Sequence, residues 1–271
     1  MVILNAKGNF YEKTVLTPFG RIEEDKVIHL ENSMRIEISD KMHLISVCND
    51  SGRIINDYGE ASSNTLPNFK EDNYPGYTVF ADASNIKSFK TTWIVPEKPQ
   101  LEDSGDTFFI WNGLSCGALQ PVLTWGNGES AYRIINWAFV GGKYVYGNYI
   151  SVNPGDTITG IISLQKIESG KWHYLLSFDG YPDADFMVAR DTEAQGVIQC
   201  FESYTTEMDR ISSSQFCSMK NIHLEVTEGA PLPEEFNWQV TGGTPVPIPS
   251  EKNTVIVDRS TVNGQIDFYF H

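Results

Sequence analysis

From Asn73 to about Leu224 the sequence consists of short runs of β-branched and aromatic residues at close spacing. Turn-forming pairs separate the runs, among them Asn127-Gly128, Gly141-Gly142, Ser169-Gly170 and Asp179-Gly180. No long segment with a helical period of hydrophobic residues interrupts them. Short strands joined by frequent turns are typical of an antiparallel sandwich or barrel. We therefore expect an all-β fold.

Alternating hydrophobicity indicates how individual strands are buried. In the run 156–166, Ile158, Ile162 and Leu164 share one face, and in the run 171–178, Tyr174 and Leu176 do so. A strand that is apolar on one face fits one layer of a two-layer sandwich. The sequence therefore predicts half-buried strands on both sides of a common core.

The two ends of the chain differ from this central region. Residues 1–72 form an N-terminal extension with strand-like alternation around 34–48, followed by a loop or linker rich in Ser, Asn and Gly over 50–72. Residues 73–227 form the expected sandwich. Residues 228–250 are rich in Pro and Gly and are expected to make an extended surface connection. Residues 254–271 end the chain in strands that we expect to return to the sandwich.

Charge and composition limit the classes of partner. The formal net charge is -15, with 20 Lys and Arg against 35 Asp and Glu. Nucleic-acid binding requires clustered basic residues, so we expect no nucleic-acid partner. The sequence contains no apolar run long enough for a membrane span or a signal peptide, so we expect no membrane insertion. A neutral ligand, either a glycan or a peptide, fits this balance better.

Signatures of cofactors and metals are missing from the sequence. The five histidines have no short ligand spacing, and the four cysteines (Cys48, Cys116, Cys200 and Cys217) form no CxxC pair. The acidic loop at Asp179, Asp183 and Asp185 has neither the Gly nor the final Glu of a calcium loop. We expect no cofactor and no metal.

Six segments, in order along the chain, resemble those of one enzyme family. They are Tyr74-Pro75-Gly76-Tyr77, SFKTTWIVP at 88–96, FIWNGL at 109–114, ALQ at 118–120, VNPGDTI at 152–158 and AQGVIQCFES at 194–203. Together they are similar to the glutamic peptidases, or eqolisins. The resemblance implies a concanavalin-like β-sandwich of jelly-roll type and an acid endopeptidase activity that depends on a Gln and a Glu.

The resemblance places this catalytic pair at Gln120 and Gln195. Gln120 matches the amide that would stabilise the oxyanion of the tetrahedral intermediate. Gln195 stands where the family has the general-base Glu, and an amide cannot accept the proton. Loss of a general base typically costs ~10²–10⁴-fold in rate. Glu193 is a weak substitute, which would share the face of Gln195 in a strand. Glu202, at an odd offset, is expected to point to the other face.

Aromatic and amide side chains near the same positions indicate an alternative use of the groove. Stacking rings beside amides are what a neutral sugar requires, although Trp residues in a sandwich are also common in the core. The candidate ligand-binding residues are Trp111, Trp125, Trp137, Asn136 and Gln199. The leading hypothesis is a non-catalytic, carbohydrate-binding protein. The alternatives are an acid peptidase or other hydrolase with a different carboxylate, and a structural sandwich whose groove is filled.

Overall fold

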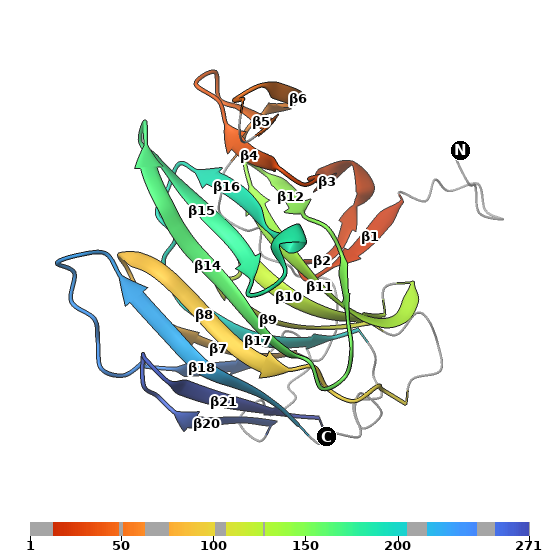
Figure 1. Ribbon diagram of the computed structural model, residues 1–271, viewed down its shortest axis with the longest axis vertical. Helices are drawn as coiled ribbons and strands as arrows, with labels where there is room; N and C mark the ends of the chain where they lie inside the picture. Colours follow the sequence, from red (N-terminus) through yellow and green to blue (C-terminus); the bar gives the residue numbers. More distant parts are fainter. Residues whose placement is uncertain are drawn as a thin grey trace.

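Two large β-sheets pack face to face in the computed structural model of the protein (Figure 1). The structure describes residues 13–48, 51–62, 76–100, 107–126, 128–204, 216–242 and 253–270. Among these residues, the helical parts are short 3-10 turns at Glu24–Lys26 and Pro182–Ala184 and the single helical residue Asn253, and none of them could cross a membrane. The all-β sandwich expected from the sequence is confirmed.

The first sheet has nine strands and carries the candidate site. Its order is β19 (Gln239–Gly242), β7 (Gly76–Ala81), β17 (Val197–Ser203), β9 (Phe108–Leu114), β10 (Leu119–Gly126), β11 (Glu129–Val140), β12 (Lys143–Tyr146) and β3 (Val27–His29), with β13 (Ile150–Val152) also paired to β11. The pairings from β19 to β12 are antiparallel, whereas β3 joins β12 in parallel.

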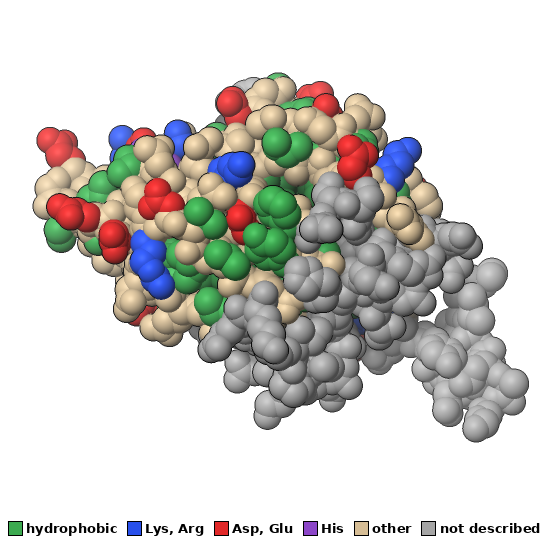
Figure 2. Space-filling model, turned by 90° about the horizontal axis from the view of Figure 1, so that it is seen from below, with side chains coloured by type: hydrophobic (Ala, Val, Ile, Leu, Met, Phe, Trp, Pro, Cys, Tyr) green, Lys and Arg blue, Asp and Glu red, His purple; other side chains and the backbone are tan. Residues whose placement is uncertain are grey.

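The second sheet has ten strands. Its order is β20 (Thr254–Asp258), β21 (Gly264–Tyr269), β18 (Phe216–Val226), β8 (Ile86–Ile94), β14 (Thr157–Glu168), β15 (Lys171–Phe178), β16 (Phe186–Arg190), β4 (Met34–Ile38), β5 (His43–Cys48) and β6 (Ile54–Glu60). Its pairings are antiparallel apart from β4, which joins β16 in parallel. Apolar side chains lie among charged ones on the side of the molecule that carries β20 and β21 (Figure 2), where Val255 and Val257 are exposed.

The shared core is built by the alternation that the sequence shows. Ile158 and Ile162 of β14 and Tyr174 and Leu176 of β15 are buried between the sheets. Trp93 of β8 lies among them as one of the largest fully buried side chains. Burial of apolar surface stabilises the fold by roughly 25 cal/mol per Å². The two sheets are thus held together along their whole inner faces.

Two segments differ from the sequence-based expectation. The predicted loop at 50–72 contains β6, whose polar residues tolerate exposure because it is the edge strand beside β5; residues 50 and 63–72 of that loop lie outside the described residues. The predicted surface connection contains β19, and Phe236 and Trp238 before it are buried in the core. Propensity alone misses such strands, because pairing with a neighbour decides their state.

A separate hairpin covers part of the first sheet. Strands β1 (Thr14–Thr17) and β2 (Gly20–Glu23) pair only with each other. Their turn is closed by the Thr17 hydroxyl, which donates to the Gly20 carbonyl at 2.9 Å, and Gly20 supplies a positive φ of 96°. The hairpin places Leu16, Phe19 and Ile22 against the nine-stranded sheet.

Candidate functional site

The face of the nine-stranded sheet that points away from the shared core carries a second apolar cluster. We call it the outer face. Its members come from β9, β10, β11, β12 and β17, from the β9–β10 turn and from the β1–β2 hairpin: Leu16, Phe19, Ile22, Phe109, Trp111, Ala118, Val122, Ile135, Trp137, Phe139, Tyr144, Ile198 and Cys200. By strand alternation this face also carries four polar side chains, Gln120, Thr124, Glu202 and Arg133, the last directly opposite Thr124.

Three of the predicted site residues meet on the outer face. Gln120 of β10 lies directly opposite Trp137 of β11, and Trp137 stacks on Tyr146 with ring centroids 4.8 Å apart. Trp111 of β9 completes the group. A Cβ atom on Gly117, which has a φ of +87°, would lie 2.8 Å from the Trp111 ring and 3.0 Å from Gln120 Nε2. The glycine therefore allows the β9–β10 turn to close over both side chains.

Three other predicted ligand-binding residues point to the opposite side of the same sheet. The Gln199 amide donates to Thr91 Oγ1 at 2.7 Å, and the Asn136 amide donates to the Ala184 carbonyl at 2.8 Å; both side chains are buried between the sheets. Trp125 packs in the shared core against Tyr132. Strand alternation separates these three from Trp111, Gln120 and Trp137, so the structure does not assemble them into one site.

Gln195 and Glu193 lie in a segment without strand pairing. Strand β17 begins at Val197, so the expectation that Glu193 shares a strand face with Gln195 is wrong. The Gln195 backbone is held beside Ser115, whose backbone N–H donates to the Gln195 carbonyl at 2.9 Å. Gln195 is exposed and lines a surface cavity with Phe80 and Cys116, whereas Gln120 is only 1% exposed. The β9–β10 turn thus separates the surroundings of the two glutamines.

Glu202 is the carboxyl group that sequence reasoning assigned to the wrong face. It shares the outer face with Trp111, because β17 is regular from Val197 onward and Glu202 lies opposite Phe109. Burial raises the pKa of the Glu202 carboxyl to about 8, and the Trp111 indole N–H, which is directed at the carboxyl, opposes that rise. Counting from the strand start rather than from Gln195 would have found it.

Glu202 and Gln120 are too far apart to act on one carbonyl group. Trp111 lies opposite Val122, so Gln120 is level with Gly113 on β9, whereas Glu202 is level with Phe109. An offset of four residues corresponds to roughly 13 Å along a strand. The two residues also lie on opposite sides of β9, with the Trp111 side chain between them. This geometry does not form the general-base and oxyanion pair of a peptidase.

Several buried polar atoms of the outer face have no hydrogen bond of normal geometry to any described residue. They are Gln120 Oε1, Thr124 Oγ1 and Trp137 Nε1; Trp111 Nε1 and Glu202 Oε2 also lack one, but the indole N–H is directed at that carboxyl. Buried polar groups without partners are uncommon, and leaving one unsatisfied costs ~1–3 kcal/mol. Three such atoms without any group directed at them, on one aromatic face, make it the strongest candidate for a ligand site in the described part of the chain.

The β1–β2 hairpin covers this site. Phe19, in the hairpin turn, meets the Trp137 ring edge-on with centroids 6.2 Å apart and lies 5.1 Å from the Tyr144 ring. The Tyr204 hydroxyl donates to the Thr17 carbonyl at 3.3 Å. As a result Trp111 and Trp137 are only 3% and 1% exposed. Access to the site therefore requires the hairpin to move.

Comparisons with known proteins find matches by structure and none by sequence. No family model and no curated protein sequence matches the chain. Its fold is similar to solved structures of glutamic peptidases. One is scytalido-glutamic peptidase with a peptide-based transition-state analogue, at 14% identity over 72% of this chain and 98% of that chain, with a TM-score of 0.46. Another is SCP-B, of the eqolisin family, in complex with the tripeptide Ala-Ile-His, at 12% identity over 73% and 99% of the chains, also with a TM-score of 0.46.

Proposed function

We propose that this protein is a non-catalytic binding protein that binds a neutral, hydroxyl-rich ligand, most simply a carbohydrate, on the outer face. The observation that carries the proposal is the set of unpartnered polar atoms among stacked aromatic rings, represented by Gln120 Oε1 and Trp137 Nε1. Sugar hydroxyls can donate to the amide oxygen and accept from the indole nitrogen. Apolar walls with a few convergent polar groups are typical of small-molecule sites.

The charge state of the outer face supports a neutral ligand. Its candidate contacts are an amide, two indoles and a hydroxyl, none of which is charged at pH 7. The Glu202 carboxyl, with a pKa of about 8, is also mostly protonated there. A protonated carboxyl can both donate and accept a hydrogen bond, as a sugar hydroxyl requires. The outer face also carries a cation, Arg133 opposite Thr124, but its guanidinium is already paired with Glu129 at 3.4 Å.

A structural role is the second candidate, and the closed hairpin favours it. Leu16, Phe19 and Ile22 already bury the aromatic side chains of the outer face. In that case the hairpin is a permanent part of the fold, and buried water forms hydrogen bonds with the polar atoms that lack a protein partner. The two candidates differ in whether the hairpin opens for a ligand.

A glycan array separates them. We expect the wild-type protein to bind at least one neutral glycan and Phe19→Ala, which weakens the cover, to bind the same glycan more tightly. Gln120→Leu should lose about tenfold or more in affinity. It should nevertheless leave stability unchanged or higher, because it removes a buried acceptor without a partner.

The stability of Gln120→Leu distinguishes lost binding from lost folding. If neither the wild-type protein nor Phe19→Ala binds a glycan above the level of Gln120→Leu, the binding proposal is wrong and the structural role is favoured. If Gln120→Leu binds as well as the wild-type protein, the ligand lies elsewhere than on the outer face.

A further inference from the structure

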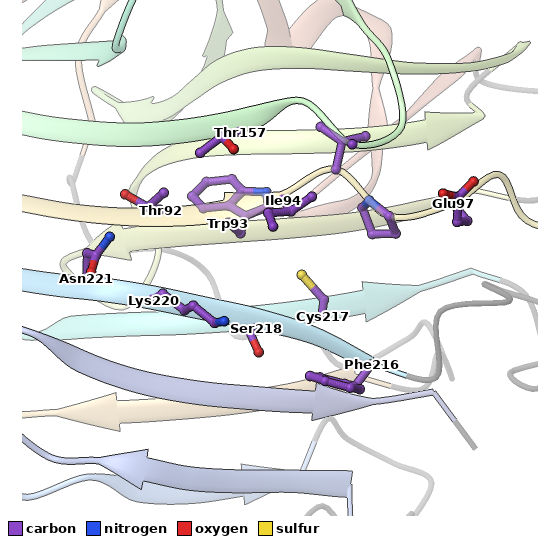
Figure 3. A pocket seen from close by; sticks show the side chains of 13 residues that line it. Thr92, Trp93, Ile94, Glu97, Thr157, Phe216, Cys217, Ser218, Lys220 and Asn221 are labelled. Atoms are coloured by element: carbon purple, nitrogen blue, oxygen red, sulfur yellow. The ribbon is translucent and has the colours of Figure 1, made fainter.

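Strands β8 and β18 of the ten-stranded sheet separate at one end. They pair from Ile86 opposite Val226 up to Thr92 opposite Lys220. Beyond that point β18 pairs only with β21, and β8 only with β14. A register shift next to Asn221, which has a φ of 49°, lies where the separation begins. Figure 3 shows the two strands diverging from Thr92 and Lys220 toward Glu97 and Phe216.

The wedge between the strands is an open cavity of about 490 Å³, within the range of ~300–1,000 Å³ typical of ligand pockets. Its inner side is formed by the buried residues Trp93 and Cys217, and the Cys217 side chain points into the gap in Figure 3. Ile94 and Phe216, which are 56% and 43% exposed, lie at its rim. The wedge therefore offers apolar contacts both in its depth and at its mouth.

Backbone groups of β8 are directed into the wedge. The Val95 N–H donates to the Asp156 carbonyl and the Gly155 N–H donates to the Val95 carbonyl, both at 2.9 Å. The backbone N–H and C=O of Val95 therefore point toward β14. Successive residues of a strand direct their backbone groups to opposite sides, so the backbone groups of Ile94 and Thr92 point toward β18. The hydroxyls of Thr92 and Thr159 are 2.8 Å apart, as expected for a pair without mutual backbone bonds.

The facing part of β18 presents backbone groups from the other side. Lys220 lies opposite Thr92, so its backbone groups point toward β8. By the same alternation, those of Ser218 and Phe216 point into the wedge. An extended peptide segment placed between the strands can consequently form backbone hydrogen bonds on both of its sides. Such strand addition is a recurrent mode of peptide recognition.

The narrow end of the wedge limits which peptide can enter. Because β8 and β18 pair directly at Thr92 and Lys220, an inserted strand has to end there. Lys220 is exposed and forms no ion pair with another described residue. Its side chain runs along β18 toward Ser218 in Figure 3. A cation beside hydroxyl groups at the point where a strand must stop fits a terminal carboxylate.

We propose that the wedge binds the C-terminal end of an extended peptide from a partner protein. The peptide inserts as a strand between β8 and β18, places its carboxylate beside Lys220, and packs apolar side chains against Ile94 and Phe216. This site is separate from the outer face of the other sheet, so it does not depend on the ligand proposed there.

The test begins with a library of six-residue peptides with free C-termini, screened against the full-length protein. The strongest binder is then synthesised as the free acid and as the C-terminal amide, and binding is measured by fluorescence anisotropy. We expect the acid to bind about tenfold or more tightly than the amide. In Lys220→Gln this ratio should fall to about one. Ile94→Asp should lose binding of both forms, whereas Ile167→Asp, at an equally exposed position, should not.

Backbone methylation tests the insertion itself. A strand bonded on both sides uses every N–H, so N-methylation at either of two consecutive inner positions should weaken binding. Addition to one edge would make only one of the two sensitive. The proposal is overturned if no library peptide prefers the wild-type protein to Ile94→Asp. It is equally overturned if acid and amide bind alike, which would indicate an apolar groove without carboxylate recognition.

Discussion

At the scale of single residues, Glu202 is the most unusual group in the protein. Its carboxyl is 7% exposed and lies beside Trp111 in an apolar cluster, with no ion pair to another described residue. Desolvation disfavours the charged form of a carboxyl, so the proton is held to higher pH. Burying such a group next to an indole N–H makes the stability of the outer face depend on pH.

The Glu202 pKa predicts a specific loss of stability with rising pH. The folded-state pKa of about 8 lies above the ordinary value of 4.5, so the folded protein keeps a proton that the unfolded chain releases. The stabilisation of the folded protein by this bound proton is complete below pH 4.5. It is lost as pH rises to about 8, and the free energy of unfolding then falls by up to ~1.4 kcal/mol per pH unit. Glu202→Gln has no such proton, so its stability relative to the wild-type protein should increase across this window.

Urea denaturation of both proteins at pH 5 and pH 8 measures this difference. Other titrating groups are common to the two proteins and cancel in the comparison. We expect Glu202→Gln to gain several kcal/mol relative to the wild-type protein between the two pH values. An unchanged difference would mean that the Glu202 carboxyl is not buried as the structure places it.

At the scale of elements, the β1–β2 hairpin determines whether the outer face is accessible. It has no strand pairing to either sheet and is held by Leu16, Phe19 and Ile22, together with the Tyr204 hydrogen bond to Thr17. An element attached mainly by side-chain packing opens at lower free energy than one paired in a sheet. The hairpin is therefore the part of the structure best suited to move.

Removing the Phe19 ring should destabilise the hairpin strongly. Phe19 is buried against Trp137 and Tyr144, and deletion of a buried aromatic ring typically costs ~3–5 kcal/mol. The matched control is Phe216→Ala, which removes a half-exposed ring and should cost about 1 kcal/mol or less. Hydrogen exchange of β1 and β2 gives the local measure: Phe19→Ala should accelerate it, and Phe216→Ala should not. Equal exchange in the two variants would contradict the packing role of Phe19.

At the scale of the whole molecule, the N-terminal extension belongs to both sheets. Strand β3 pairs with β12 in the first sheet and β4 pairs with β16 in the second, each in parallel. Because β3 ends at His29 and β4 begins at Met34, the chain passes from one sheet to the other between these two residues. The extension therefore links the two layers of the sandwich.

Truncation tests this linkage. Starting the chain at residue 76 removes β1 to β6, which exposes the outer face and the edges of β12 and β16. We expect the unfolding midpoint to fall by more than about 5 °C and the truncated protein to aggregate. Starting at residue 31, which keeps β4 to β6, should give an intermediate midpoint. An unchanged midpoint in both would show that the extension is an independent unit.

The sequence by itself determined the fold class and much of the core. Period-two alternation in β14 and β15 predicts which side chains are buried between the sheets, because the side-chain direction of a strand is fixed by the backbone. The motifs around Trp111 and Gln120 likewise placed two neighbouring strands correctly. These properties are local, so neighbouring residues are enough to reveal them.

Only the tertiary structure decided which candidate residues share a site. The start of β17 at Val197 sets the face of both Gln199 and Glu202, and a shift of one residue reverses every assignment. The cover of the outer face by Phe19 depends on residues more than a hundred positions apart in the chain. Such contacts form because apolar surfaces that the fold brings together are stabilised by burial. The residues next to Phe19 in the sequence therefore do not indicate which distant residues it will contact.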